Sequence, residues 1–167
     1  MLFVGNSRGV KRPVVRDAVA AGLDLAVYGQ GWDRFLDPGV VRGSYIPNAE
    51  LAATYRAAGV VLNDHWDDMR RRGFLSNRLF DLAACGARVV TDEISGLRDV
   101  FGDVISTYRS PGELAEVVQQ QARNNAERDA KRQALAVRIR SEHSFDARVE
   151  RLIEVAEVAR RSQGVRA

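Results

Sequence analysis

A short stretch near the middle of the chain carries polar side chains at a spacing that suits an anionic, hydroxylated ligand. Residues 73–92 read GFLSNRLFDLAACGARVVTD, in which Ser76 or Asn77 can cap the start of a helix. Asn77, Arg78 and Asp81 lie three or four residues apart, so they share one helix face. Free N–H groups and the positive dipole at a helix start hold phosphate. A carboxylate one turn further in can accept hydrogen bonds from sugar hydroxyls.

The remainder of this predicted helix is apolar, which sets the polar face apart. Residues 79–85 are apolar except for Asp81, so most of the helix should be buried. Gly86 is a natural C′ residue, and 87–91 form a β-branched strand. A local ion pair between Arg78 and Asp81 on a solvated face is the alternative. A buried helix with one small polar face favours ligand binding.

Short apolar strands alternate with helices along the chain, which predicts an α/β fold with a doubly wound, Rossmann-like parallel sheet and a central first strand. We expect one domain over residues 1–161 and a frayed tail over 162–167. The predicted strands are 2–5, 23–29, 60–63, 87–91 and 104–106. The predicted helices are 13–21, 48–58, 76–85, 96–101, 112–124, 125–142 and 145–161. Loops are predicted over residues 35–43 and 64–72.

A ligand of such a sheet binds at the carboxyl ends of the strands, so the loops after Gly5, Gly29, Asn63 and Thr91 should line one cleft. The sequences GNSRG and GQG lack the G-x-G-x-x-G pattern, which counts against NAD. The first of these loops is basic, and its cations, Arg8, Lys11 and Arg12, could face phosphate or simply solvent.

His65 follows a predicted strand, where it can line the same cleft and contact a sugar or a phosphate. With Asp67 and Asp68 it could also be read as a metal cluster, but the spacing is not that of a ligand motif. We therefore expect no metal ion. Cys85 precedes the helix-ending glycine without basic neighbours, so it should be a core residue.

The central stretch resembles the donor-binding segment of GT-B glycosyltransferases, in particular the CgeB-like family of glycosyl transferases group 1. Gly73–Phe74, an acidic residue at Asp81, Cys85–Gly86 and the strand residues Val89–Val90 carry the resemblance. The opening Val-Gly-Asn and the later Tyr-Gly-x-x-Trp are similar too, and the resemblance extends from residue 3 to about residue 153. A second acid that is frequent in the wider pattern is replaced here by Gly73.

This resemblance implies one half of a GT-B fold with C-terminal helices, which binds a nucleotide-sugar donor. It implies that Asp81 contacts the ribose, that residues 76–78 face the diphosphate, and that residues 43–47 lie against the base. The nucleotide sugar is a substrate, and no cofactor is expected. The expected donor-binding residues are Asn6, Arg8, Lys11, Arg12, Tyr45, Ile46, His65, Phe74, Ser76, Asn77, Arg78 and Asp81.

The function implied is transfer of a sugar to an acceptor, by an enzyme that stabilises the departing nucleoside diphosphate. The catalytic base is expected in an N-terminal acceptor domain, either in a longer chain or in a partner protein, without which this chain should be inactive. A non-catalytic module that binds a nucleotide or a nucleotide sugar is the alternative. A flavodoxin-like or response-regulator-like signalling domain needs an acidic cluster after the first strand, where this chain has Asn6, Ser7 and Arg8.

The composition is that of an ordinary globular domain, with 167 residues, 46% hydrophobic and 28% charged, and a net charge of +3. The single cysteine excludes an internal disulfide and a cysteine zinc site. Acids interspersed among the arginines of the last helices indicate a solvated helix face rather than a nucleic-acid site. No signal peptide or long apolar run is recognised, so we expect a cytoplasmic protein without a membrane span.

Overall fold

The computed structural model describes residues 1–164, with side chains to residue 161, and contains one six-stranded sheet. The strand order is β3-β2-β1-β4-β5-β6, and every neighbouring pair is parallel. This is the strand order of doubly wound α/β folds, so the predicted fold class and the central first strand are confirmed. The strands are β1 (Leu2–Val4), β2 (Ala26–Tyr28), β3 (Val41–Gly43), β4 (Val61–Leu62), β5 (Val89–Asp92) and β6 (Ser106–Tyr108).

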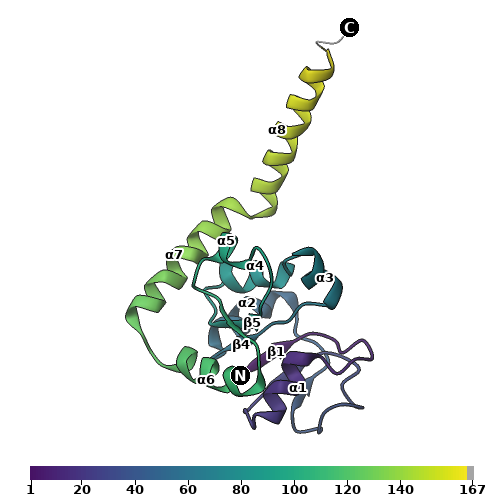
Figure 1. The fold of residues 1–167 in the computed structure, drawn as a ribbon, viewed down its shortest axis with the longest axis vertical. Helices are drawn as coiled ribbons and strands as arrows, with labels where there is room; N and C mark the ends of the chain where they lie inside the picture. The colour runs from purple at the N-terminus through teal and green to yellow at the C-terminus, as the bar shows by residue number, and fades with distance from the viewer. Residues whose placement is uncertain (165–167) are drawn as a thin grey trace.

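Helices cover both faces of the sheet (Figure 1). α1 and α6 pack together on one face, and α4 packs against α2 and α7 on the other. The helices are α1 (Pro13–Ala20), α2 (Asn48–Ala57), α3 (Asp67–Arg72), α4 (Asn77–Ala84), α5 (Leu97–Phe101), α6 (Pro111–Ala122), α7 (Ala126–Glu142) and α8 (Phe145–Gly164).

Each face of the sheet has its own apolar core. Phe3, Val27 and Leu62 point toward α1 and α6, whereas Leu2 and Val61 point toward α4 and α7. Successive residues of a strand face opposite sides, so a sheet covered on both faces needs strands that are apolar throughout. These short apolar runs explain why the alternation of strands and helices was readable from the sequence.

Two elements lie where the sequence predicted only loops. β3 occupies the end of the predicted loop 35–43 and pairs with β2 at the sheet edge, with an irregular register. α3 occupies most of the predicted loop 64–72. Its first turn is acidic and its last turn is basic, which suits the helix dipole. β6 begins two residues later than predicted, at Ser106.

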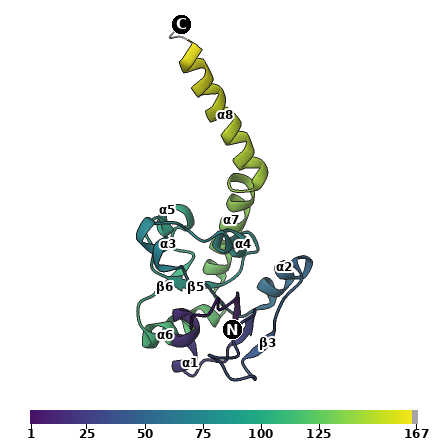
Figure 2. The same cartoon turned by 90° about the vertical axis from the view of Figure 1, so that its right-hand side faces the viewer.

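α7 lies against the body of the protein, where it packs on α4, and α8 projects beyond that body (Figures 1 and 2). Phe145 and Leu152 on α8 are 87% and 68% exposed, so this helix carries apolar side chains outside any core. Residues 162–164 continue the backbone of α8, and the rest of the tail for which fraying was predicted lies outside the described residues. Within the described chain, no helix is long and apolar enough to cross a membrane.

Candidate functional site

The order of the strands reverses between β1 and β4, and the loops that follow these two strands leave a crevice between them. A cavity of about 250 Å³ lies in this crevice, and we call it the switch-point pocket. Its walls come from the loop after β1, the end of β4, the start of α3 and the start of α4. The lining residues are Gly5, Asn6, Arg8, Arg12, Asp64, Trp66, Met69, Ser76 and Arg78.

The loop after β1 is fixed by hydrogen bonds to the loop after β2. Asn6 Oδ1 accepts a hydrogen bond from the backbone N–H of Gln30 at 2.8 Å. The backbone N–H of the buried Ser7 donates to the Gln30 carbonyl at 3.0 Å, and the Ser7 hydroxyl donates to the Gly31 carbonyl. Arg8 has φ +54°, a left-handed conformation that is unusual for a residue other than glycine. Such conformations persist where surrounding contacts impose them, often at functional sites.

Close approach of the two loops also explains the glycine that ends β2. A Cβ on Gly29 would lie 2.1 Å from the carbonyl oxygen of Gly5, so no larger residue fits there. The indole N–H of Trp32 donates to the same carbonyl at 2.8 Å. The Tyr-Gly-x-x-Trp sequence therefore holds the end of β1 in place at the edge of the pocket.

A buried ion pair forms one wall of the switch-point pocket. Arg12, at the start of α1, donates from Nε to Asp64 Oδ2 at 3.0 Å, and Nη2 pairs with Oδ1. The Arg12 guanidinium also stacks on the Trp66 ring, 4.3 Å from its centroid. Burial raises the pKa of the Asp64 carboxyl, and the charge of Arg12 opposes that shift. The guanidinium is thus held in one orientation by a carboxylate and an aromatic face.

The N-terminus of α4 opens toward the same pocket. Ser76 occupies the N-cap position as predicted, but its side chain makes no capping hydrogen bond. The first N–H groups of α4 are therefore not satisfied by that hydroxyl and can serve an acceptor in the pocket. At the other end of α4, Gly86 has the positive φ predicted for a C′ residue.

Arg78 brings a second guanidinium to the end of β1. A Cβ on Gly5 would lie 3.3 Å from an Arg78 guanidinium nitrogen, so this side chain lies against the Gly5 backbone. The guanidinium carbons of Arg78 and Arg12 lie 5.9 and 5.8 Å from the ring centroid of Phe3. The buried Phe3 ring thus supports two cations at once.

Asp81 is on α4 but does not line the switch-point pocket. Partial burial raises the pKa of its carboxyl, and the positive charges of Arg78 and Arg148 oppose the shift. Asp81 is otherwise exposed to solvent, and its charge helps to raise the pKa of Tyr55 on α2. In the described part of the chain, no ion pair within 4.0 Å joins it to Arg78.

The structure gathers only some of the predicted donor-binding residues in one pocket. Asn6, Arg8, Arg12, Ser76 and Arg78 meet there. Sequence reasoning did not select Asp64, Trp66 and Met69, although the loop after β4 was expected at the cleft. Six other predicted residues lie outside the pocket. Lys11, Asn77 and Asp81 are exposed, as are Tyr45 and Phe74 at 67% and 64%, whereas Ile46 is buried.

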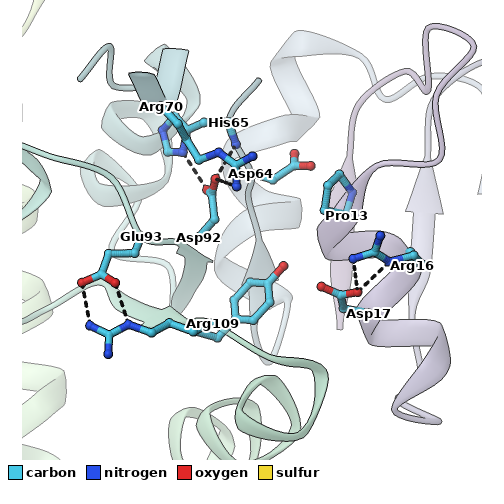
Figure 3. A pocket seen from close by; sticks show the side chains of 10 residues that line it. Pro13, Arg16, Asp17, Asp64, His65, Arg70, Asp92, Glu93 and Arg109 are labelled. Carbon is cyan, nitrogen blue, oxygen red and sulfur yellow. Dashed lines mark hydrogen bonds and ion pairs between the residues drawn. The ribbon is translucent and has the colours of Figure 1, made fainter. Parts of the chain in front are cut away.

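His65 is also outside the switch-point pocket. Its ring is fully buried, and Nδ1 lies 2.7 Å from Asp92 Oδ1 at the end of β5. The backbone N–H of His65 donates to the other oxygen of Asp92 at 3.3 Å. Both residues belong to the wall of a second cavity, of about 330 Å³, at the ends of β4, β5 and β6 (Figure 3). We call it the β4–β6 pocket.

No metal cluster accompanies these pockets in the described residues: no three His, Cys, Asp or Glu side chains come together as metal ligands would. Asp67 pairs with Arg70 along α3, and Asp68 pairs with Arg71. These two carboxylates are the ones that the sequence analysis considered, with His65, as a metal cluster. The cationic side chains that line the switch-point pocket are those of Arg8, Arg12 and Arg78.

Comparison with protein families gives a match that covers most of the chain. A family model described as glycosyl transferase-like matches residues 11–154. A search of curated proteins gives no match. The matched segment contains Arg12, Asp64, Ser76 and Arg78, and therefore most of the switch-point pocket.

Proposed function

The chain belongs to the glycosyl transferase-like family, and we propose that it is the donor-binding half of a GT-B glycosyltransferase of the CgeB-like type. In this proposal the chain binds a nucleotide sugar, and a second domain presents the acceptor to which the sugar is transferred. One observation carries the proposal: three arginines and the uncapped start of α4 meet in a single pocket at the switch point of the sheet.

The charges of the switch-point pocket favour a diphosphate. Arg8, Arg12 and Arg78 line it against a single carboxylate, that of Asp64. Guanidinium groups bind phosphate oxygens through paired N–H donors, and a helix start adds backbone N–H groups and a favourable dipole. The pocket volume of about 250 Å³ suits a diphosphate rather than a whole nucleotide sugar.

The nucleoside of the donor would lie beside this pocket, on the side of α2. We assign the exposed Asp81 carboxylate to the ribose hydroxyls and the exposed Tyr45 to the base. These assignments follow from the family resemblance and from the position of α4 beside α2.

The proposed chemistry is stabilisation of the leaving group. As the bond between the sugar and the diphosphate breaks, negative charge grows on the phosphate oxygens. The orientation of Arg12 is fixed by Asp64 and Trp66, so this cation needs no rearrangement to meet that charge. A catalytic base would come from the acceptor domain. The exposed apolar side chains of α8 are one surface on which such a domain could pack.

A thermal-shift screen tests the proposal. A ligand that binds only the native state raises the melting temperature, so nucleoside diphosphates of the correct base should stabilise the chain. Replacement of Arg8 by Gln should reduce that shift, whereas replacement of Arg123, which is exposed after α6, should not. If no nucleoside diphosphate or nucleotide sugar raises the melting temperature, the proposed donor site is wrong.

A second experiment separates an enzyme from a binding module. Joined to an acceptor domain of the same family, an active donor half should hydrolyse or transfer the sugar of its donor. A non-catalytic module would bind the same ligand without turnover.

A further inference from the structure

Another cavity lies near the amino end of β6, at the opposite edge of the sheet from the two pockets described above. It is enclosed by α6, the first turns of α7 and the loop that precedes β6, and we call it the α6–α7 pocket. Its volume is about 100 Å³. It has no lining residue in common with the switch-point pocket or the β4–β6 pocket. The lining residues are Asp103, Val104, Gln121, Arg128, Lys131 and Arg132.

Arg132 brings to this pocket a buried donor that no described residue satisfies. Its side chain is 11% exposed, and Nη2 pairs with Asp129 Oδ1 one turn earlier on α7. The Nε of the same guanidinium is buried and has no hydrogen-bond partner among the described residues. A buried donor without a partner costs free energy unless a ligand or a water molecule accepts from it. Because Arg132 lines the α6–α7 pocket, an acceptor in that pocket can meet this need.

Two further cations line the pocket from the same helix. Arg128 is half-buried, and within residues 1–161 its guanidinium forms no hydrogen bond or ion pair. Lys131 Nζ lies 3.2 Å from Glu127 and 3.4 Å from Asp103. The hydrogen bond to Glu127 and the charge of Asp103 raise the pKa of Lys131, so its ammonium stays charged. Arg128, Lys131 and Arg132 are spaced by three and four residues, which puts all three on one face of α7.

The charges around the pocket favour an anion. Three cations line it against one carboxylate, that of Asp103, whose side chain is 72% exposed and can be solvated by water. The amide of the buried Gln121 completes the wall, and it is held in place because Nε2 donates to Ser106 Oγ at 2.6 Å. The pocket thus combines an excess of positive charge with donors at fixed positions.

We propose that the α6–α7 pocket binds a compact tetrahedral oxyanion, either inorganic phosphate or a terminal phosphoryl group, which accepts from Arg132 Nε and from the Arg128 guanidinium. Guanidinium groups bind phosphate oxygens through paired N–H donors. A cavity of about 100 Å³ is far smaller than the pockets that hold drug-sized ligands, so it admits a small ion and excludes a nucleotide. The bound ion would strengthen the contact of α7 with α6 and with the loop before β6. This inference does not depend on the proposed function.

Titration with inorganic phosphate tests the inference, with the ionic strength held constant by sodium chloride. The switch-point pocket would also attract phosphate, so the titration is made in an Arg78→Gln background, which removes a cation from that pocket. Phosphate should still raise the melting temperature there, and it should slow hydrogen exchange of the backbone N–H groups over residues 126–132.

In the same background, Arg128→Gln should weaken the binding of phosphate by about tenfold. Arg128 is preferred to Arg132 for this test because Arg132→Gln would also break the pair with Asp129. Arg123→Gln, an exposed change after α6 and outside the pocket, is the matched control and should leave the response unchanged.

Glycerol 3-phosphate distinguishes the two sources of the ion. If it binds at least as tightly as phosphate, the pocket takes the phosphoryl group of a larger molecule, and if phosphate alone binds, the ligand is the free ion. The inference is overturned if phosphate has no effect beyond that of chloride in the Arg78→Gln background, or if Arg128→Gln and Arg123→Gln respond alike. Phosphate binding that is present in wild type and lost in Arg78→Gln would place the ion in the switch-point pocket, which contradicts this inference and leaves the proposed function standing.

Discussion

Arg12 and Asp64 form a buried ion pair that joins the start of α1 to the end of β4, with Arg12 Nε 3.0 Å from Asp64 Oδ2. Their side chains are 8% and 2% exposed. Removal of one partner leaves the other charge buried without compensation, so Asp64→Ala should destabilise the fold by about 3–5 kcal/mol. Urea unfolding measures this loss. Asp67→Ala, which breaks an exposed pair on α3, should change stability little. Equal losses in the free energy of unfolding would mean that the buried pair stabilises the fold no more than an exposed pair does.

Trp66 should report ligand binding through its fluorescence. Its ring stacks on Arg12 at 4.3 Å and lines the switch-point pocket, whereas Trp32 is 1% exposed and lies in the core. A diphosphate that binds Arg12 changes the surroundings of the Trp66 indole and therefore its emission. Trp66→Phe keeps an aromatic face under the guanidinium and should abolish the ligand-dependent change. A change of the same size in this variant would locate the signal at Trp32 and argue against the pocket.

Asp81 is predicted to accept hydrogen bonds from the ribose hydroxyls. A hydrogen bond to a charged group contributes about 1.5–3 kcal/mol, so Asp81→Ala should weaken a nucleoside diphosphate by roughly tenfold to a hundredfold. It should barely affect a 2′,3′-dideoxy analogue, which has no ribose hydroxyls to donate. Asp99→Ala, on α5, serves as the control. Equal losses for both ligands would show that Asp81 acts through the fold or through Arg78.

The raised pKa of Asp81 also predicts how binding depends on pH. The carboxylate is the better acceptor, so affinity for a nucleotide sugar should fall as the pH drops through this pKa, which lies above the ordinary value of 3.8. For stability the sign is opposite: the contribution of a carboxyl with a raised folded-state pKa is full at low pH and is lost as the pH rises through it. Calorimetry across this range should show a pH dependence that is reduced in Asp81→Asn. An unchanged pH dependence in that variant would assign it to another group.

The sequence predicted local features of the site better than long-range ones. The helix from Asn77 and its end before Gly86 follow from apolar spacing and a glycine, which are local properties. Arg8, Arg12, Ser76 and Arg78 could be expected together because strand ends meet at one edge of a parallel sheet.

What the sequence could not supply is the pairing of distant side chains. Asp64 meets Arg12 across 52 positions, and no local pattern marks that contact. His65, which was expected to face a ligand, lines the β4–β6 pocket, and no local pattern marks its 2.7 Å contact with Asp92, which is 27 positions away. Tyr108 enters the second pocket only because β6 pairs with β5. The acidic first turn and basic last turn of α3 are a local helix signal, although residues 64–72 were predicted to form a loop.

The central claim, that the switch-point pocket binds the diphosphate of a nucleotide sugar without a metal ion, is tested most directly by calorimetry in the presence of EDTA. Wild type should bind the nucleoside diphosphate found in the thermal-shift screen, and Arg78→Gln should weaken it by about tenfold or more. Arg71→Gln, an exposed change on α3 outside the pocket, should leave affinity unchanged. Binding that appears only on addition of Mg²⁺ or Mn²⁺, or an Arg78→Gln variant that binds as tightly as wild type, would contradict the account.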